Sequence, residues 1–266
     1  MIGQKNLLTI LNNQLVDDKL ARFIIIVGEA GSEKNFVAKE LAKQNNILCI
    51  EVPDCKIDTI RQMINDAYTV AKPTIFSITN ADDMSVNAKN ALLKVTEEPP
   101  NKARFVMTLQ NISNTLDTIK SRATIYQADK YSKNQLEEYC NTKGYKDKEL
   151  LLNICSTPGD IDLINSYGAK NFYEFVCKVT DNIATVSGAN SFKIAKSLKL
   201  KDTDEGYDLA LFFKTFFLVC IMNNWFNGGA LTGKYLADLH FKSVNKQMLF
   251  DAWLLKIREV WRSGNC

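Results

Sequence analysis

Short, solidly apolar runs alternate with helical patterns through the first half of the chain, and this alternation limits the fold more than any other feature. The run Phe23–Val27 (FIIIV) is apolar at every position and ends at Gly28. A strand that is apolar on both faces is typical of a parallel sheet, because helices cover both sides of such a sheet. Leu7, Leu8 and Leu11 precede this run at helical spacing.

The same alternation then repeats along the chain. It predicts strands over residues 23–27, 47–52, 74–78 and 105–109, and helices over residues 57–70 and 86–97, with another helix opening near Phe36. Strands that alternate with helices indicate an α/β layer with a mostly parallel sheet. We expect residues 1–130 to form this domain.

Helix signals replace strand signals from Tyr131 onward. Ser132 and Gln135 have the spacing of a capping box, Asp147 is placed to cap a helix, and Pro158 breaks the chain before another short helix. We therefore expect a small helical domain over residues 131–168 and an all-helical C-terminal domain over residues 169–266.

One apolar stretch in the C-terminal part covers residues 209–222 and contains Lys214. It is shorter than the roughly 20 residues that span a bilayer. We therefore expect a buried core helix here, and no membrane association.

Composition argues against several kinds of chemistry. The seven cysteines are odd in number and form no C-x-x-C pair, which argues against a disulfide framework and a zinc site. His240 is the only histidine, so a histidine base is not expected. The N-terminus lacks the continuous apolar segment of a secretory signal, and we expect a cytoplasmic protein. A net charge of +3 is too small to indicate nucleic-acid binding by itself.

The stretch GEAGSEKN, which begins at Gly28, looks like a phosphate-binding loop with two departures. Such a loop reads G-x-x-x-x-G-K-[ST], and its backbone amides and lysine hold phosphates. Gly28, Gly31 and Lys34 stand in the expected places, whereas Glu33 and Asn35 do not. The loop by itself is weak support for a nucleotide site.

The segment between Asn80 and Arg122 is more informative. The runs NALLK (90–94), EEPP (97–100), Phe105 and TIKSR (118–122) resemble, in order and spacing, the signature of clamp-loader subunits of the AAA+ family. The IGQ run at residues 2–4 and the S-x-x-G pattern at residues 156–159 extend this resemblance over about residues 1–168.

The resemblance implies an AAA+ P-loop domain, a helical lid and an all-α collar that joins the subunits of the DNA polymerase III clamp loader. The implied partners are ATPase subunits called gamma or tau and a delta subunit and, through the complex, a sliding clamp and primed DNA. Some members carry a four-cysteine zinc module, which Cys49 and Cys55 alone cannot form. We expect neither a metal nor a cofactor.

The resemblance also assigns a role to each position of the ATP site, and at most of these positions this sequence has a residue of a different chemical type. Glu33 replaces a glycine whose conformation costs other residues roughly 1–2 kcal/mol, and its carboxylate would repel phosphate. Asn35 replaces the hydroxyl that holds Mg²⁺. Thr79 and Asn80 stand where an Asp-Glu pair would support the metal and position water.

Two further parts of the site point the same way. Residues 108–111 offer no clear polar contact for a γ-phosphate, and Asp160 stands where a sensor arginine is expected. Phosphoryl transfer needs the charges of metal, lysine and arginine together, so we expect no hydrolysis by this chain alone. The alternative is that Asp82 or Asp83 has replaced the missing carboxylate.

Gly28, Gly31 and Lys34 are therefore expected to be the remains of a nucleotide site. Arg122 is retained, although alanine replaces the cysteine that follows it in the family. In the family this arginine enters a neighbour's ATP site, where a guanidinium stabilises the transferred phosphoryl group. The alternative is a surface arginine in a turn.

The expected function is that of a non-hydrolysing clamp-loader subunit that helps load the sliding clamp and supplies Arg122 in trans. An ATP-hydrolysing clamp-loader subunit and an AAA+-derived scaffold outside replication are the alternatives. We expect the C-terminal tryptophans to pack within the helical domain. The cations Lys89, Lys94, Lys102 and Arg104 are expected on a solvated face, with phosphate contact as the alternative.

Overall fold

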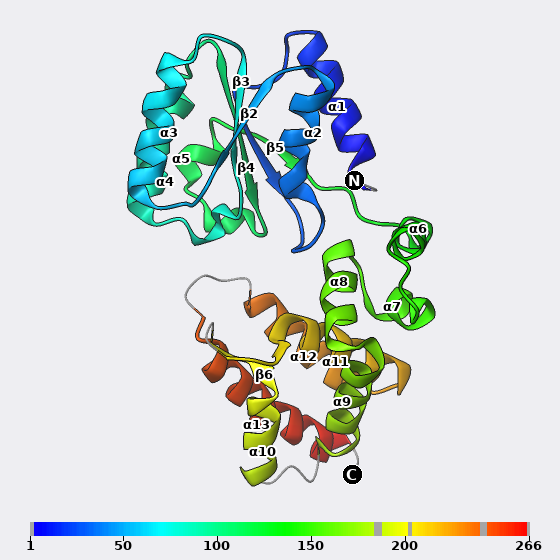
Figure 1. The fold of residues 1–266 in the computed structure, drawn as a ribbon. Coiled ribbons are helices and arrows are strands. Elements are labelled where there is room, and N and C mark those ends of the chain that lie inside the picture. Colours follow the sequence, from blue (N-terminus) through cyan, green and yellow to red (C-terminus); the bar gives the residue numbers. More distant parts are fainter. Residues whose placement is uncertain (1–2, 184–187, 202–203, 240–243, 265–266) are drawn as a thin grey trace. The chain divides into compact units, whose positions relative to one another are not determined.

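The computed structural model describes residues 3–183, 188–201, 204–239 and 244–264 (Figure 1). Ile2 of the IGQ run, His240 and Cys266 lie outside the described residues. The chain forms two compact units, Met1–Tyr139 with Thr157–Gly159, and Cys140–Ser156 with Asp160–Cys266. The division into domains 1–130, 131–168 and 169–266 stays a prediction, and residues 140–156 group with the C-terminal helices.

A parallel five-stranded sheet lies at the centre of the first unit, in the order β2-β3-β4-β1-β5. Its strands are β1 (Phe23–Val27), β2 (Leu48–Val52), β3 (Thr74–Ile78), β4 (Ala103–Leu109) and β5 (Thr124–Gln127). The predicted α/β layer is confirmed. Every residue of β1, β3 and β4 is buried, as expected for strands covered on both faces.

Helices cover both faces of this sheet, with α1 and α2 on one side and α3, α4 and α5 on the other (Figure 1). The helices that cover the sheet are α1 (Lys5–Val16), α2 (Val37–Gln44), α3 (Ile57–Thr69), α4 (Val86–Glu97) and α5 (Asp117–Lys120). The helix α6 (Lys133–Lys143) follows β5 in the chain, and the 3₁₀ turns are η1 (Lys34–Phe36), η2 (Ala81–Asp83) and η3 (Ile112–Asn114). Ser85 caps α4 by accepting from the Ala88 amide (3.2 Å). The capping box also forms: the Ser132 amide donates to Gln135 Oε1 (2.9 Å).

The topology brings three loops together. β3, β4 and β1 are neighbours and run in parallel, so the segments after them leave the sheet at the same edge. In open α/β sheets this edge is where ligands bind.

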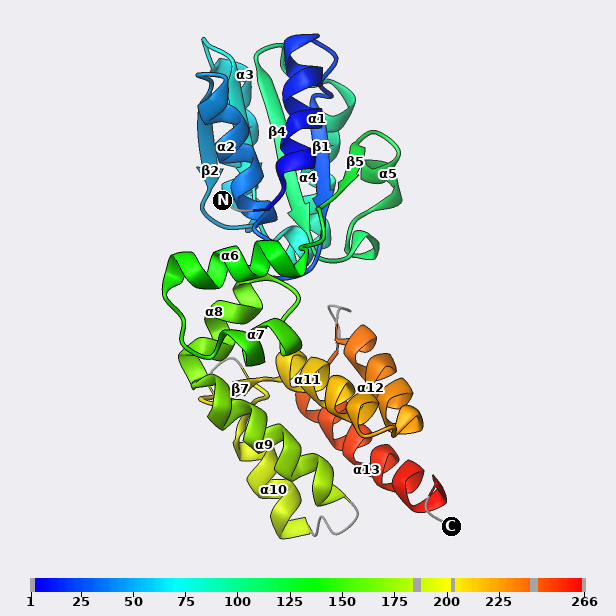
Figure 2. The same cartoon turned by 90° about the vertical axis from the view of Figure 1, so that its right-hand side faces the viewer.

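Among its described residues, the second unit is helical except for one short pair of strands. Its elements are α7 (Lys148–Ile154), α8 (Pro158–Tyr167), α9 (Ala169–Asp181), α10 (Gly188–Lys196), β6 (Leu198–Lys199), β7 (Tyr207–Asp208), α11 (Leu209–Met222), α12 (Phe226–Asp238) and α13 (Lys246–Gly264). In Figure 2, α11, α12 and α13 lie side by side. Asp147 precedes α7, but its carboxylate pairs with Lys170 (3.2 Å) and does not cap the helix.

The predicted buried core helix is α11, and its bounds coincide with the apolar stretch. Phe212, Phe213 and Phe216 are fully buried, and all three rings contact the Trp253 ring of α13. This aromatic cluster is the core of the second unit and gives Trp253 the packing role expected from the sequence. None of the described helices combines the length and apolar character needed to cross a membrane.

Candidate functional site

The loop after β1 contains the glycine and lysine positions of the phosphate-loop pattern. The Gly28 amide donates to the Leu109 carbonyl of β4 (3.0 Å), which fixes the start of the loop. Gly31 and Glu33 both have a left-handed backbone, with φ of 72° and 59°. Glu33 therefore holds a conformation that favours glycine, as expected, at roughly 1–2 kcal/mol of strain.

Tyr131 holds Glu33 in this conformation. Its hydroxyl lies 3.0 Å from Glu33 Oε2 and 3.1 Å from the Ser32 carbonyl. Burial and the neighbouring Glu33 carboxylate raise the pKa of Tyr131 far above its usual value, so the phenol stays protonated and available as a donor.

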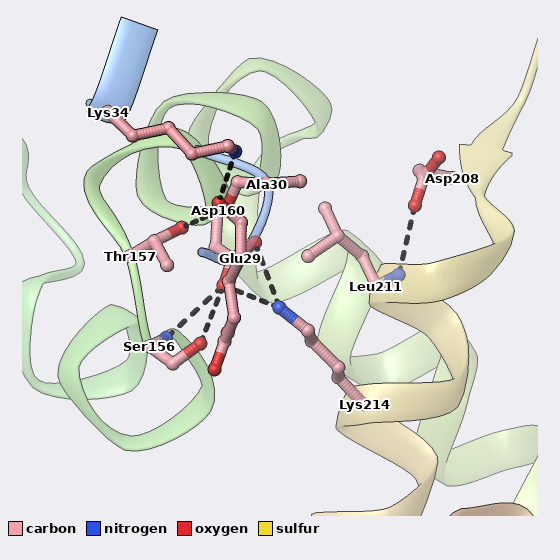
Figure 3. Close-up of polar contacts among 9 residues, drawn as sticks. All are labelled: Glu29, Ala30, Lys34, Ser156, Thr157, Asp160, Asp208, Leu211 and Lys214. Carbon is pink, nitrogen blue, oxygen red and sulfur yellow. Dashed lines mark hydrogen bonds and ion pairs between the residues drawn. The ribbon is translucent and has the colours of Figure 1, made fainter. Parts of the chain in front are cut away.

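Lys34 folds back onto its own loop. The side chain is buried, and Nζ donates to the Glu29 carbonyl (2.9 Å; Figure 3). Burial lowers the pKa of Lys34, while the Asp82 and Glu29 carboxylates partly offset that effect. The ammonium thus interacts with protein groups where a phosphate loop would present it to a nucleotide.

Residues 157–159 pack directly against this loop and belong to the same unit. Thr157 Oγ1 donates to the Ala30 carbonyl (3.2 Å; Figure 3), and the Gly159 amide donates to the Gly31 carbonyl (3.1 Å). A Cβ added to Gly159 would lie 2.4 Å from Gly31 Cα, closer than any side chain permits. The two backbones are therefore in direct contact, which only glycine allows here.

Three neutral side chains meet at the sheet edge beside the loop. Thr108 Oγ1 of β4 donates to Asn35 Oδ1 (2.7 Å), and Asn35 Nδ2 donates to Asn80 Oδ1 (3.0 Å). The backbone amide of Asn80 donates to Thr108 Oγ1 (3.1 Å), so the three residues form a closed ring of hydrogen bonds. We call Asn35, Asn80 and Thr108 the neutral triad. Its groups bind one another without any charge.

Asp82, the candidate replacement carboxylate, caps a turn. Its oxygens accept from the amides of Gln110 (2.8 Å) and Asn111 (3.1 Å) and from Asn114 Nδ2 (2.9 Å). Both oxygens therefore bind the segment that follows β4. Among the described ranges, no three His, Cys, Asp or Glu side chains are grouped so that they could hold a metal ion.

Asp160, at the expected sensor position, forms a buried ion pair in the second unit. Its carboxylate accepts from the Ser156 amide (3.3 Å) and hydroxyl (3.0 Å), and Lys214 Nζ lies 3.2 Å away (Figure 3). Asp160 thus holds the start of α8 and neutralises the one cation within the apolar helix α11.

Arg122 lies just after α5 and does not join the residues of the loop. Its Nη1 donates to the Thr118 carbonyl (2.8 Å), and its Nη2 forms an ion pair with Glu97 Oε1 (3.1 Å). The side chain is 39% exposed, so the guanidinium remains accessible from outside the unit.

The expectation of a solvated basic face is wrong for two of its four residues. Lys89 is buried and donates to the Asn114 carbonyl, and Arg104 is buried and pairs with Asp18 (3.2 Å). Lys89 joins α4 to η3, and Arg104 joins β4 to the segment after α1, which the sequence pattern alone does not reveal. Lys102 and Lys94 are exposed, and Lys94 lies over the Tyr68 ring.

Gln4 is a site residue whose role the sequence pattern did not reveal. It is fully buried, and its Nε2 donates to the carbonyls of Ser32 (2.9 Å) and Asp129 (3.0 Å). The Asp129 amide donates in return to Gln4 Oε1 (2.7 Å). Gln4 therefore ties the loop to the segment after β5.

Residues 47–132 match the protein family described as DNA polymerase III, delta subunit. The chain is also similar to DNA polymerase III subunit gamma of Buchnera aphidicola subsp. Acyrthosiphon pisum, at 23% identity over 76% of this chain and 68% of the relative.

Two solved structures from Thermotoga maritima share the fold. One is a DNA polymerase III gamma subunit-related protein, with a TM-score of 0.52 at 17% identity over 95% of this chain and 98% of that chain. The other is RuvB, with a TM-score of 0.51 at 16% identity over 96% and 88% of the two chains. These two structures show an AAA+-like fold. The match over residues 47–132 and the gamma-subunit relative support a clamp-loader family protein of DNA polymerase III.

Proposed function

We propose that this chain is a delta-prime-type subunit of the bacterial DNA polymerase III clamp loader, one that hydrolyses no ATP and supplies Arg122 to a neighbour's ATP site. The observation that carries the proposal is the neutral triad. Asn35 and Asn80 stand where a metal ligand and a water-positioning carboxylate are expected, and a Mg²⁺ ion prefers charged oxygen ligands.

The contacts around the loop support the same proposal. The carbonyls of Ala30 and Gly31 bind residues 157–159, and Lys34 Nζ binds the loop itself. A nucleotide phosphate would have to compete with the Glu29 carbonyl for Lys34 Nζ, and the Glu33 carboxylate would repel it. Gly28, Gly31 and Lys34 are in this proposal structural remnants of a phosphate loop.

Arg122 would act in the assembled complex. Its exposed guanidinium can reach a neighbouring subunit, and charge stabilisation by an arginine in trans is a large term in phosphoryl transfer. The proposed partners are gamma or tau ATPase subunits and a delta subunit in the cytoplasm. Through that complex the chain would help open the sliding clamp and place it on primed DNA.

The alternative, an ATP-hydrolysing clamp-loader subunit, is favoured by the relative named gamma and by the retained Lys34. Photo-crosslinking of a reconstituted complex with an azido-ATP separates the two. The proposal expects label on the ATPase subunits and none on this chain. Mg²⁺-dependent labelling of this chain to the same extent would support the alternative.

Lys34→Met is expected to leave clamp- and DNA-stimulated ATP hydrolysis of the complex within about twofold of wild type, because Lys34 contacts no nucleotide in this account. The folded state disfavours the lysine charge, since burial lowers its pKa, so the free energy of unfolding should stay within about 1 kcal/mol or rise. Steady-state turnover and urea denaturation measure the two quantities. A tenfold loss of turnover in an intact complex would show that Lys34 is functional.

A further inference from the structure

The carboxylate of Glu97 and the guanidinium of Arg122 come from two separate elements that pack together. Glu97 is the last residue of α4, and Arg122 follows α5. Ile119 of α5 is fully buried in the same core cluster as Leu92 and Val95 of α4. The backbones that carry the pair are therefore held by the core of the first unit.

Three groups hold the guanidinium in one orientation. Glu97 Oε1 binds Nη2 (3.1 Å), while the Thr118 carbonyl (2.8 Å) and Ser121 Oγ (3.4 Å) bind Nη1. Each terminal nitrogen thus has a partner from this chain, which restricts the rotation of the guanidinium. An arginine held this way loses less conformational freedom when it enters a second binding site.

Stability does not account for Glu97 at this position. The pair is partly exposed, with side-chain exposures of 39% for Arg122 and 52% for Glu97, and ion pairs this exposed add little to folding. A carboxylate at the last residue of a helix also faces the negative end of the helix dipole. The Glu97 carboxylate therefore contacts the guanidinium at a position where the dipole of α4 disfavours a negative charge.

We propose that Glu97 is a positioning residue that orients Arg122 for its action on the neighbouring subunit's ATP. This inference rests on the proposed function of Arg122 and adds the group that orients its guanidinium. Effective transition-state stabilisation requires the donor to be in place before the reaction, because reorientation during the reaction reduces the gain. Glu97 acts through Arg122 and touches no nucleotide.

The chain offers a matched control in Glu98. This residue is exposed and adjacent, and Glu98→Gln removes the same charge from the same helix end without removing a partner of Arg122. The test measures single-turnover ATP hydrolysis and the ATP concentration for half-maximal rate in the reconstituted complex. The variants are Glu97→Gln, Glu98→Gln, Arg122→Ala and the Glu97→Gln, Arg122→Ala double variant.

We expect Glu97→Gln to lower the maximal rate about five- to tenfold without changing the half-saturating ATP concentration, and Glu98→Gln to change neither. In the Arg122→Ala background, Glu97→Gln should have no further effect. Glu97→Asp, which keeps the charge on a shorter side chain, should recover part of the rate.

The outcomes separate the two claims. If Arg122→Ala lowers the rate while Glu97→Gln behaves like wild type or like Glu98→Gln, the positioning role is overturned and the role of Arg122 stands. If Arg122→Ala leaves the rate unchanged, the proposed function itself fails. A further loss from Glu97→Gln in the Arg122→Ala background would also overturn the inference, since Glu97 would then act without Arg122.

Discussion

Replacing Arg122 with alanine is expected to slow ATP hydrolysis at the neighbouring subunit's site by about 10³-fold, because an arginine supplied in trans contributes roughly that much to phosphoryl transfer. The substitution removes one partly exposed ion pair, so the fold and the assembly of the complex should persist. Single-turnover hydrolysis in the reconstituted complex, with clamp and primed DNA present, measures the effect.

Lys120→Ala is the matched control for this experiment. Lys120 lies two residues before Arg122, carries the same charge and forms its own surface ion pair with Asp117 (2.9 Å). We expect the complex that contains Lys120→Ala to hydrolyse ATP at the wild-type rate. Equal rates for Arg122→Ala and Lys120→Ala in complexes of equal composition would contradict the proposed action of Arg122 at the neighbouring subunit's ATP site.

Replacing Lys214 with methionine is expected to lower the free energy of unfolding of the second unit by about 2–4 kcal/mol. The substitution leaves the Asp160 carboxylate, which is almost fully buried, without its cation. Urea denaturation followed by tryptophan fluorescence reports this unit, because Trp225, Trp253 and Trp261 all lie in it.

A double variant separates the loss of the pair from the loss of packing. Asp160→Asn combined with Lys214→Met removes both charges, so it should recover much of the stability lost in Lys214→Met alone. If the single variant unfolded at the wild-type urea concentration, the ion pair would contribute nothing to the second unit.

The sequence predicts the central strands well because β1 is apolar at every position and β3 and β4 are mostly apolar. β1 and β3 coincide with the predicted ranges, and α11 coincides with its apolar stretch. β5 was not predicted, because its four residues, TIYQ, contain no apolar run. The other edge strand, β2 (LCIEV), was recognised by its alternating Leu48, Ile50 and Val52.

The sequence predicted which positions depart from an ATP site, but it did not predict the contacts that the side chains at these positions make. The sequence identifies Asn35, Asn80 and Asp160 as departures from an ATP site, yet it does not show that Asn35 and Asn80 bind Thr108 or that Asp160 binds Lys214. Those contacts join elements far apart in the sequence. The close approach of Gly31 and Gly159 is likewise a tertiary feature.

The burial of the basic residues Lys89 and Arg104 also could not be predicted from the local sequence. A lysine or arginine at an exposed-looking position can direct its charged end to a carbonyl or carboxylate of another element, as Lys89 and Arg104 do. Their partners, Asn114 and Asp18, are distant in sequence. Local spacing therefore could not distinguish these two residues from the exposed Lys94 and Lys102.

The most direct test of the central claim is equilibrium titration of the purified chain with a fluorescent ATP analogue, with and without Mg²⁺. The neutral triad and the binding of Lys34 Nζ to the Glu29 carbonyl predict no saturable binding up to millimolar nucleotide, and no release of phosphate. Saturable, Mg²⁺-dependent binding at micromolar concentration, accompanied by turnover, would contradict the account.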